Sequence, residues 1–74
     1  MKLNQLAVGE SATVVSISGE EETVERIMEM GLIEGTNIRV VRFAPLGDPI
    51  EIEARGYHLT LRKQEASLVE IERI

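Results

Sequence analysis

Two carboxylates and an imidazole, the side chains of Glu51, Glu53 and His58, lie close together in the sequence. The alternation of apolar and polar residues around them predicts that all three occupy the polar face of one β-hairpin. Such a group could in principle hold a divalent transition metal. The competing interpretation is a solvated strand face on which Glu53 and His58 form a cross-strand ion pair. We favour the ion pair and expect no required cofactor, with weak binding of a divalent transition metal as the alternative.

The sequence contains few of the residue patterns that a catalytic mechanism requires. It has no cysteine and one histidine, so a Ser-His-Asp arrangement could use only His58, which lies mid-strand with no glycine elbow beside it. The six glycines are isolated from one another and form no phosphate-binding pattern. We therefore predict that the protein is not an enzyme.

Arginines and one leucine are the candidates for contact with a partner protein. Four arginines alternate with apolar positions: Arg39, Arg42, Arg55 and Arg62. Each either balances nearby acids or contacts a partner, and Arg42 and Arg62 are the better candidates because they flank a proline loop and the base of the hairpin. Leu46, at the tip of that loop, is expected either to pack back against the rest of the domain or to be presented to another protein.

The loop that contains Leu46 is predicted to be rigid. Its sequence, Ala44-Pro-Leu-Gly-Asp-Pro49, places the only two prolines of the chain on either side of Gly47. Proline fixes φ and donates no backbone hydrogen bond, so neither end lies within a central strand, and Gly47 allows a positive φ. The flanking segments, Asn37–Phe43 and Ile50–Arg55, are predicted to be strands because they are rich in β-branched residues or alternate apolar with polar residues.

The hairpin that follows the loop can be registered from the sequence. A two-residue turn at Arg55-Gly56 folds the strand 57–62 back along 50–55. Every rung then joins like with like: Ala54 with Tyr57, Glu53 with His58, Ile52 with Leu59, Glu51 with Thr60 and Ile50 with Leu61. A loop of odd length would place the isoleucines opposite polar residues, so parity alone excludes it.

The N-terminal half is predicted to hold the first strand and the only helix. Ala12–Ile17 has strand propensity, although the doubled valine at 14 and 15 leaves the inward face undetermined. Ser18 is expected to cap the helix, because a glutamate three residues later completes a capping box. Gly31 is expected to end the helix in a left-handed conformation.

The remaining pattern completes a mainly β domain. Val24, Ile27 and Met28 fall on one face of the helix, whose expected role is to cover an open end of a barrel. Arg62–Ala66 resembles a single helical turn, and Leu68–Ile71 is predicted to be the closing strand. About five strands with one short helix inserted after the first predict a small closed or half-closed barrel, a single domain over residues 1–74.

The distribution of charge limits the possible partners. The formal net charge is −5, which argues against a nucleic-acid partner held by phosphate neutralisation. Six acids and one base, Arg26, lie between Glu20 and Glu34, so we expect one acidic face. No run approaches transmembrane length, and we expect no direct insertion into a membrane.

Several short motifs follow one another in a consistent order between Gly9 and Ile71. They are Glu29-Met-Gly-Leu32, Gly35-Thr36, Val40-Val-Arg42, Ala44-Pro-Leu-Gly-Asp-Pro49, Arg55-Gly-Tyr57, Leu61-Arg62 and Ala66. Together they resemble the FeoA family of ferrous iron transport accessory proteins. The unbroken Ala-Pro-Leu-Gly-Asp-Pro segment with the Arg-Gly-Tyr hairpin is the most specific part of this resemblance.

The resemblance implies an SH3-like β-barrel that acts in bacterial or archaeal ferrous iron uptake. The implied partner is the FeoB-type transporter of the inner membrane, contacted through its GTP-binding domain or its membrane core. This would place the protein in the cytoplasm, peripheral to the membrane through its partner. The same domain occurs at the C-terminus of some iron-dependent repressors. The family supplies no catalytic or metal-ligand residues to assign to this chain.

From these observations we predict a protein-interaction module, with a monomer as the favoured state. The predicted partner-binding residues are Arg42, Leu46, Gly47, Asp48, Pro49, Arg55, Tyr57 and Arg62. The alternative is a domain that binds or senses ferrous iron through Glu51, Glu53 and His58. A third possibility is an arginine offered in trans to modulate nucleotide hydrolysis by the partner.

Overall fold

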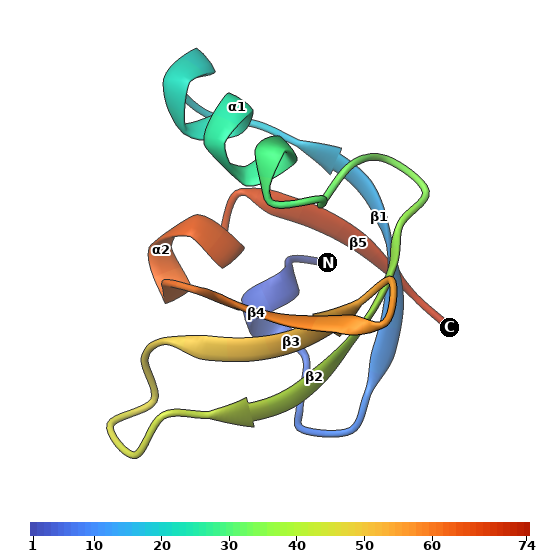
Figure 1. Cartoon of the computed structure of the whole chain (residues 1–74), viewed down its shortest axis with the longest axis vertical. Coiled ribbons are helices and arrows are strands. Elements are labelled where there is room, and N and C mark those ends of the chain that lie inside the picture. Colours follow the sequence, from blue (N-terminus) through green and yellow to red (C-terminus); the bar gives the residue numbers. More distant parts are fainter.

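The computed structural model describes all 74 residues and contains one sheet of five antiparallel strands in the order β4-β3-β2-β1-β5 (Figure 1). In chain order the elements are the short 3-10 turn η1 (Leu3–Gln5), β1 (Ser11–Ile17), α1 (Glu21–Glu29), β2 (Asn37–Phe43), β3 (Ile50–Ala54), β4 (Tyr57–Leu61), α2 (Lys63–Ala66) and β5 (Val69–Arg73). Strands β1 to β4 are sequential neighbours, and β5 returns to pair with β1. The predicted mainly β fold with a short helix after the first strand is confirmed.

The hairpin of β3 and β4 has the predicted register at every rung, from Ile50 opposite Leu61 to Ala54 opposite Tyr57. Its two turn residues, Arg55 and Gly56, have φ values of +54° and +83°. Positive φ at both central positions is the requirement of a type I′ turn, whose twist matches that of the flanking strands. Glycine meets this requirement without strain.

The two doubled valines of the sequence mark β-bulges. The pairing of β1 with β5 shifts between Val14 and Ser16, and that of β2 with β3 shifts between Val40 and Arg42. Val15 and Val41 are therefore the extra residues. Val14 is buried and Val15 is 39% exposed, which settles the inward face that the sequence left undetermined. Because bulges bend a strand and increase its twist, they help this short sheet to curl around its core.

Helix α1 begins later than the sequence predicts. Glu20, not Ser18, is the N-cap, and no side chain bonds to the first turn. The predicted capping box is wrong. The backbone N–H of Ser18 bonds to the carbonyl of Leu68 at 3.0 Å, which prolongs the pairing of β1 with β5 by one residue, and the helix begins only after Glu20. At the other end, Gly31 has a φ of +102°, as expected of a left-handed helix ending.

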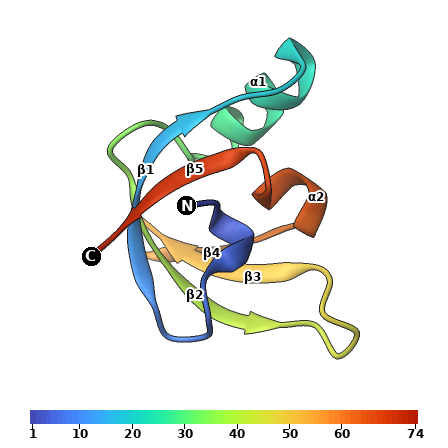
Figure 2. The ribbon, with the colours of Figure 1, turned by 180° about the vertical axis from the view of Figure 1, so that it is seen from behind.

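The core is entirely aliphatic. Fifteen buried residues form one cluster, which includes Leu3 and Leu6 from the N-terminal arm and Ile27 from α1. Figure 2 shows η1 between β5 and the β3–β4 hairpin, where it fills the space that the two unpaired edge strands leave open. The predicted barrel is thus half-closed. Neither helix combines the length and the apolar character that crossing a membrane requires.

Candidate functional site

The proline loop between β2 and β3 holds Leu46 in solvent. The N–H of Gly47 donates to the carbonyl of Ala44 at 2.7 Å, and the N–H of Ala44 donates to the carbonyl of Pro49 at 3.0 Å. These bonds close a tight turn with Pro45 at the position where its fixed φ is favoured. Leu46 follows it and is 96% exposed. The side chain is therefore presented by the loop, not packed against the barrel.

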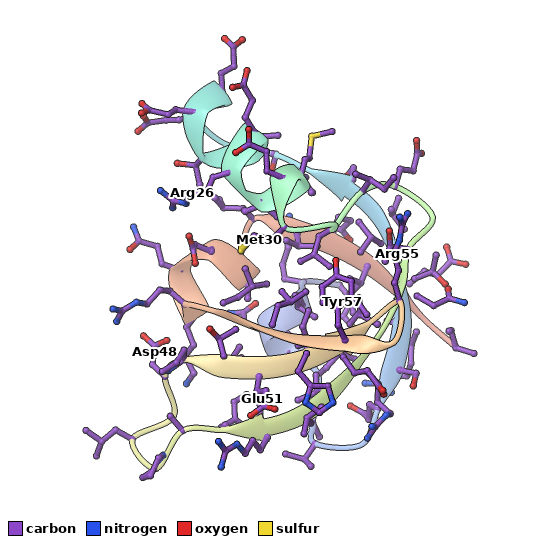
Figure 3. The ribbon with its side chains drawn as sticks, viewed as in Figure 1. Arg26, Met30, Asp48, Glu51, Arg55 and Tyr57 are labelled. Atoms are coloured by element: carbon purple, nitrogen blue, oxygen red, sulfur yellow. The ribbon has the colours of Figure 1, made fainter.

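Asp48 ties this loop to the start of α2 (Figure 3). Its carboxylate accepts a hydrogen bond from the backbone N–H of Lys63 at 3.0 Å, so it satisfies one of the donors that a helix N-terminus leaves free. The Lys63 side chain extends over Gly47, because a Cβ at position 47 would lie 3.4 Å from Nζ. Lys63 forms no ion pair with a carboxylate. The sequence did not single out this lysine, since fifteen residues separate it from its loop contact.

A hollow of about 110 Å³ lies beside the loop, lined by Arg42, Pro45, Pro49, Glu51 and others. Arg42 donates to one oxygen of Glu51 at 2.7 Å, and His58 Nδ1 lies 2.9 Å from the other oxygen. The Arg42 guanidinium, supported by His58, holds the pKa of the Glu51 carboxyl below its usual value. The bulge at Val41 produces this arrangement, because it sets Arg42 directly opposite Glu51.

The predicted ion pair between Glu53 and His58 is wrong. Glu53 pairs with Arg39 at 2.9 Å, and His58 reaches diagonally to Glu51 instead. Diagonal neighbours on one face of a sheet lie within reach of long side chains, so directly opposite residues need not pair. Of the three metal-ligand candidates, the structure brings Glu51 and His58 together and leaves Glu53 with its arginine. No group of three or more histidine, aspartate or glutamate side chains is placed to hold a metal.

Tyr57 and Arg55 lie at the far end of the hairpin from the proline loop. The five residues of β3 separate the two ends, a distance of about 17 Å. The Tyr57 hydroxyl donates to the Met30 carbonyl at 2.8 Å and so satisfies an acceptor at the C-terminus of α1 (Figure 3). Arg55, in the turn, forms no ion pair.

Arg62 faces a third region. It lines a polar hollow of about 580 Å³ between α1 and α2, together with Glu20, Arg26 and Glu65. The backbone N–H of Arg62 and the Arg26 side chain both bond to Glu65, and they hold the pKa of that carboxyl below its usual value. The predicted partner-binding residues thus divide among three regions, and the loop group is Arg42 with residues 46–49.

Known proteins resemble this chain over its whole length. A family model described as the FeoA domain matches residues 1–73. The chain is 38% identical over 74 residues to a Porphyromonas gingivalis protein, the Fe(2+) transport protein A/Fe(2+) transporter FeoB fusion protein. That alignment covers 100% of this chain and 9% of the fusion protein, so the chain spans a small part of that relative.

Solved structures agree with the family model. The solution structure of FeoA from Chlorobium tepidum superposes with a TM-score of 0.92 at 42% identity, over 100% of this chain and 70% of that one. The zinc complex of Stenotrophomonas maltophilia FeoA, described as a prokaryotic SH3 domain protein, gives 0.83 at 28% identity over 97% and 89% of the two chains. A manganese-dependent transcriptional repressor superposes with a TM-score of 0.93 at 17% identity, over 100% of this chain and 36% of that one. This likeness shows a shared fold alone.

The curled sheet of five strands with a helix inserted after β1 is an SH3-like barrel of the kind found in small prokaryotic accessory and regulatory proteins. The chain belongs to the FeoA family, the accessory proteins of ferrous iron transport. The resemblance that the motif order indicated is therefore confirmed.

Proposed function

We propose that the protein is a non-enzymatic interaction module that docks on the cytoplasmic side of a FeoB-type ferrous iron transporter and modulates it. The observation that supports this most directly is Leu46, 96% exposed on a loop whose geometry is held by three hydrogen bonds. A rigid apolar tip loses little conformational entropy on binding, so its burial in a partner contributes to affinity efficiently. The fusion of a similar domain to a FeoB transporter in Porphyromonas gingivalis supports the choice of partner.

The docking surface comprises the loop residues 46–49 with Arg42 and Lys63. Lys63 makes no ion pair, and the side chain of Arg42 is 76% exposed although it bonds to Glu51. An apolar tip on a surface that also holds two cations favours a partner that offers an apolar pocket with acidic residues at its rim. Arg55, Tyr57 and Arg62 lie outside this surface.

The proposal is tested by the affinity for the transporter's cytoplasmic domain, measured with Leu46→Asp and Lys63→Glu variants. Both side chains are exposed, so the variants are expected to fold as the parent does, which circular dichroism checks. We expect each to weaken binding about tenfold or more. Arg55→Glu is the matched control, since it reverses an unpaired arginine at the other end of the hairpin. Unchanged affinity in a folded Leu46→Asp variant would rule this surface out.

A second candidate function is binding or sensing of a transition metal through Glu51 and His58. It is favoured by the 2.9 Å contact between these two side chains and by the zinc complex of the Stenotrophomonas protein. A metal at this pair would compete with Arg42 for the Glu51 carboxylate, which predicts weak affinity. A His58→Ala variant that binds ferrous iron as well as the parent would count against this function.

A further inference from the structure

A shallow apolar groove of about 230 Å³ runs between β1 and α1, on a different part of the molecule from the proline loop. It is lined by Val15, Ser16, Ile17, Val24, Met28, Ile33 and Glu34. Three of the eight exposed large hydrophobic side chains gather here: Val15, Met28 and Ile33, which are 39%, 45% and 38% exposed. Their clustering distinguishes the groove from the scattered apolar residues that any protein surface displays.

The later part of β1 forms one wall of the groove. Strand β2 pairs with β1 only over Ser11–Thr13, so the later part of β1 has no strand beside it on that side. Val15 points outward there because side chains alternate along a strand and its neighbour Val14 is buried, and the bulge leaves Ser16 exposed as well. The opposite wall is formed by Val24 and Met28, one helical turn apart on α1.

Acidic side chains surround the groove. Glu21 and Glu25 each lie three residues before a groove residue of α1 and so share its side of the helix, and Glu34 lines the groove directly. All six acids between Glu20 and Glu34 are exposed, and none forms an ion pair. The helix dipole favours the acids of the first turn, but it disfavours Glu29 in the last turn. The negative charge therefore exceeds what the helix itself requires.

We propose that this groove binds a basic, amphipathic segment of a partner protein, which places one or two aliphatic side chains in the groove and lysines or arginines against its acidic rim. The apolar walls and the unpaired carboxylates call for both features in the same ligand. The groove does not include the Leu46 surface, so either proposal can fail without the other.

The test is a nuclear magnetic resonance titration of the whole labelled chain with a short synthetic peptide that has two leucines one helical turn apart among lysines. We expect chemical-shift changes centred on Val15, Val24, Met28 and Ile33, and an affinity that falls as salt is added. Two matched control peptides separate the contribution of the apolar side chains to the affinity from that of the positive charges. One replaces the leucines with serines and the other replaces the lysines with glutamates, and we expect each to bind at least tenfold more weakly.

Variants of the chain complete the experiment. Met28→Lys and Glu25→Lys keep good helix formers in α1, and each is expected to weaken peptide binding about tenfold. Leu46→Lys is the matched control and should bind as the parent does. The proposal is overturned if the shifts spread over all acidic residues without affecting the groove, if Met28→Lys leaves the affinity unchanged, or if no basic peptide binds. It is also overturned if sedimentation shows that a second copy of the chain occupies the groove.

Discussion

Replacing Gly31 with alanine is expected to destabilise the protein through two separate effects. The residue ends α1 with a φ of +102°, where an alanine is strained. In addition, a Cβ at this position would collide with the Tyr57 hydroxyl oxygen. The tyrosine must therefore move, and its hydrogen bond to the Met30 carbonyl is then lost.

Gly35 provides the matched control for the size of each effect. Its φ is +89°, and a Cβ there would meet nothing within 4 Å, so Gly35→Ala introduces strain alone. That strain is expected to lower the free energy of unfolding by about 1–3 kcal/mol. Gly31→Ala should lose the same amount plus about 0.5–1.5 kcal/mol for the tyrosine hydrogen bond. The melting temperature of Gly31→Ala should fall by about 10 °C or more.

Chemical denaturation of both glycine variants, in the parent and in a Tyr57→Phe background, measures the coupling between position 31 and the Tyr57 hydroxyl. Without the hydroxyl the close contact disappears, so Gly31→Ala in that background is expected to cost no more than Gly35→Ala. The interaction free energy of the cycle should therefore be about 0.5–1.5 kcal/mol. Equal costs for the two glycines in the parent, together with no coupling, would refute the reasoning. Tyr57 would then have no part in fixing the end of α1.

Three further perturbations follow from single contacts. Asp48→Ala removes the acceptor for the Lys63 N–H, so hydrogen exchange at that amide should be faster and stability lower by about 0.5–1.5 kcal/mol. Thr36→Val removes a buried hydroxyl that bonds to the Gly31 carbonyl and the Ile33 N–H, and urea denaturation should show a loss of about 1 kcal/mol. The lowered pKa of Glu65 stabilises the fold above its unfolded value of 4.5, and this contribution is lost as pH falls through the lower folded value. The free energy of unfolding, measured by denaturation at neutral pH and at about pH 3, should therefore fall less on acidification in Glu65→Gln than in the parent.

The β3–β4 hairpin could be predicted in detail because its signals are local. Alternation over 50–54, the Arg55-Gly56 turn and the return over 57–61 leave one register that pairs apolar with apolar residues, and the structure has that register. The start of α1 could not be predicted in this way. Ser18 has the right spacing for a cap, but a tertiary hydrogen bond to Leu68 prolongs the pairing of β1 with β5 through this residue, and the helix begins only after Glu20.

The side-chain pairs of the site were less predictable than the strands, and one feature accounts for much of the difference. A bulge at Val41 brings Arg42 opposite Glu51, so Glu51 takes both Arg42 and His58, and Glu53 is left to pair with Arg39. The sequence does contain a signal, since a doubled valine breaks the alternation in both bulged strands. A strand with two adjacent β-branched residues must turn one of them outward or insert an extra residue. In this protein both bulges lie next to a candidate surface: the one in β2 positions Arg42 beside the proline loop, and the one in β1 lies at Val15 and Ser16, in the wall of the acidic groove.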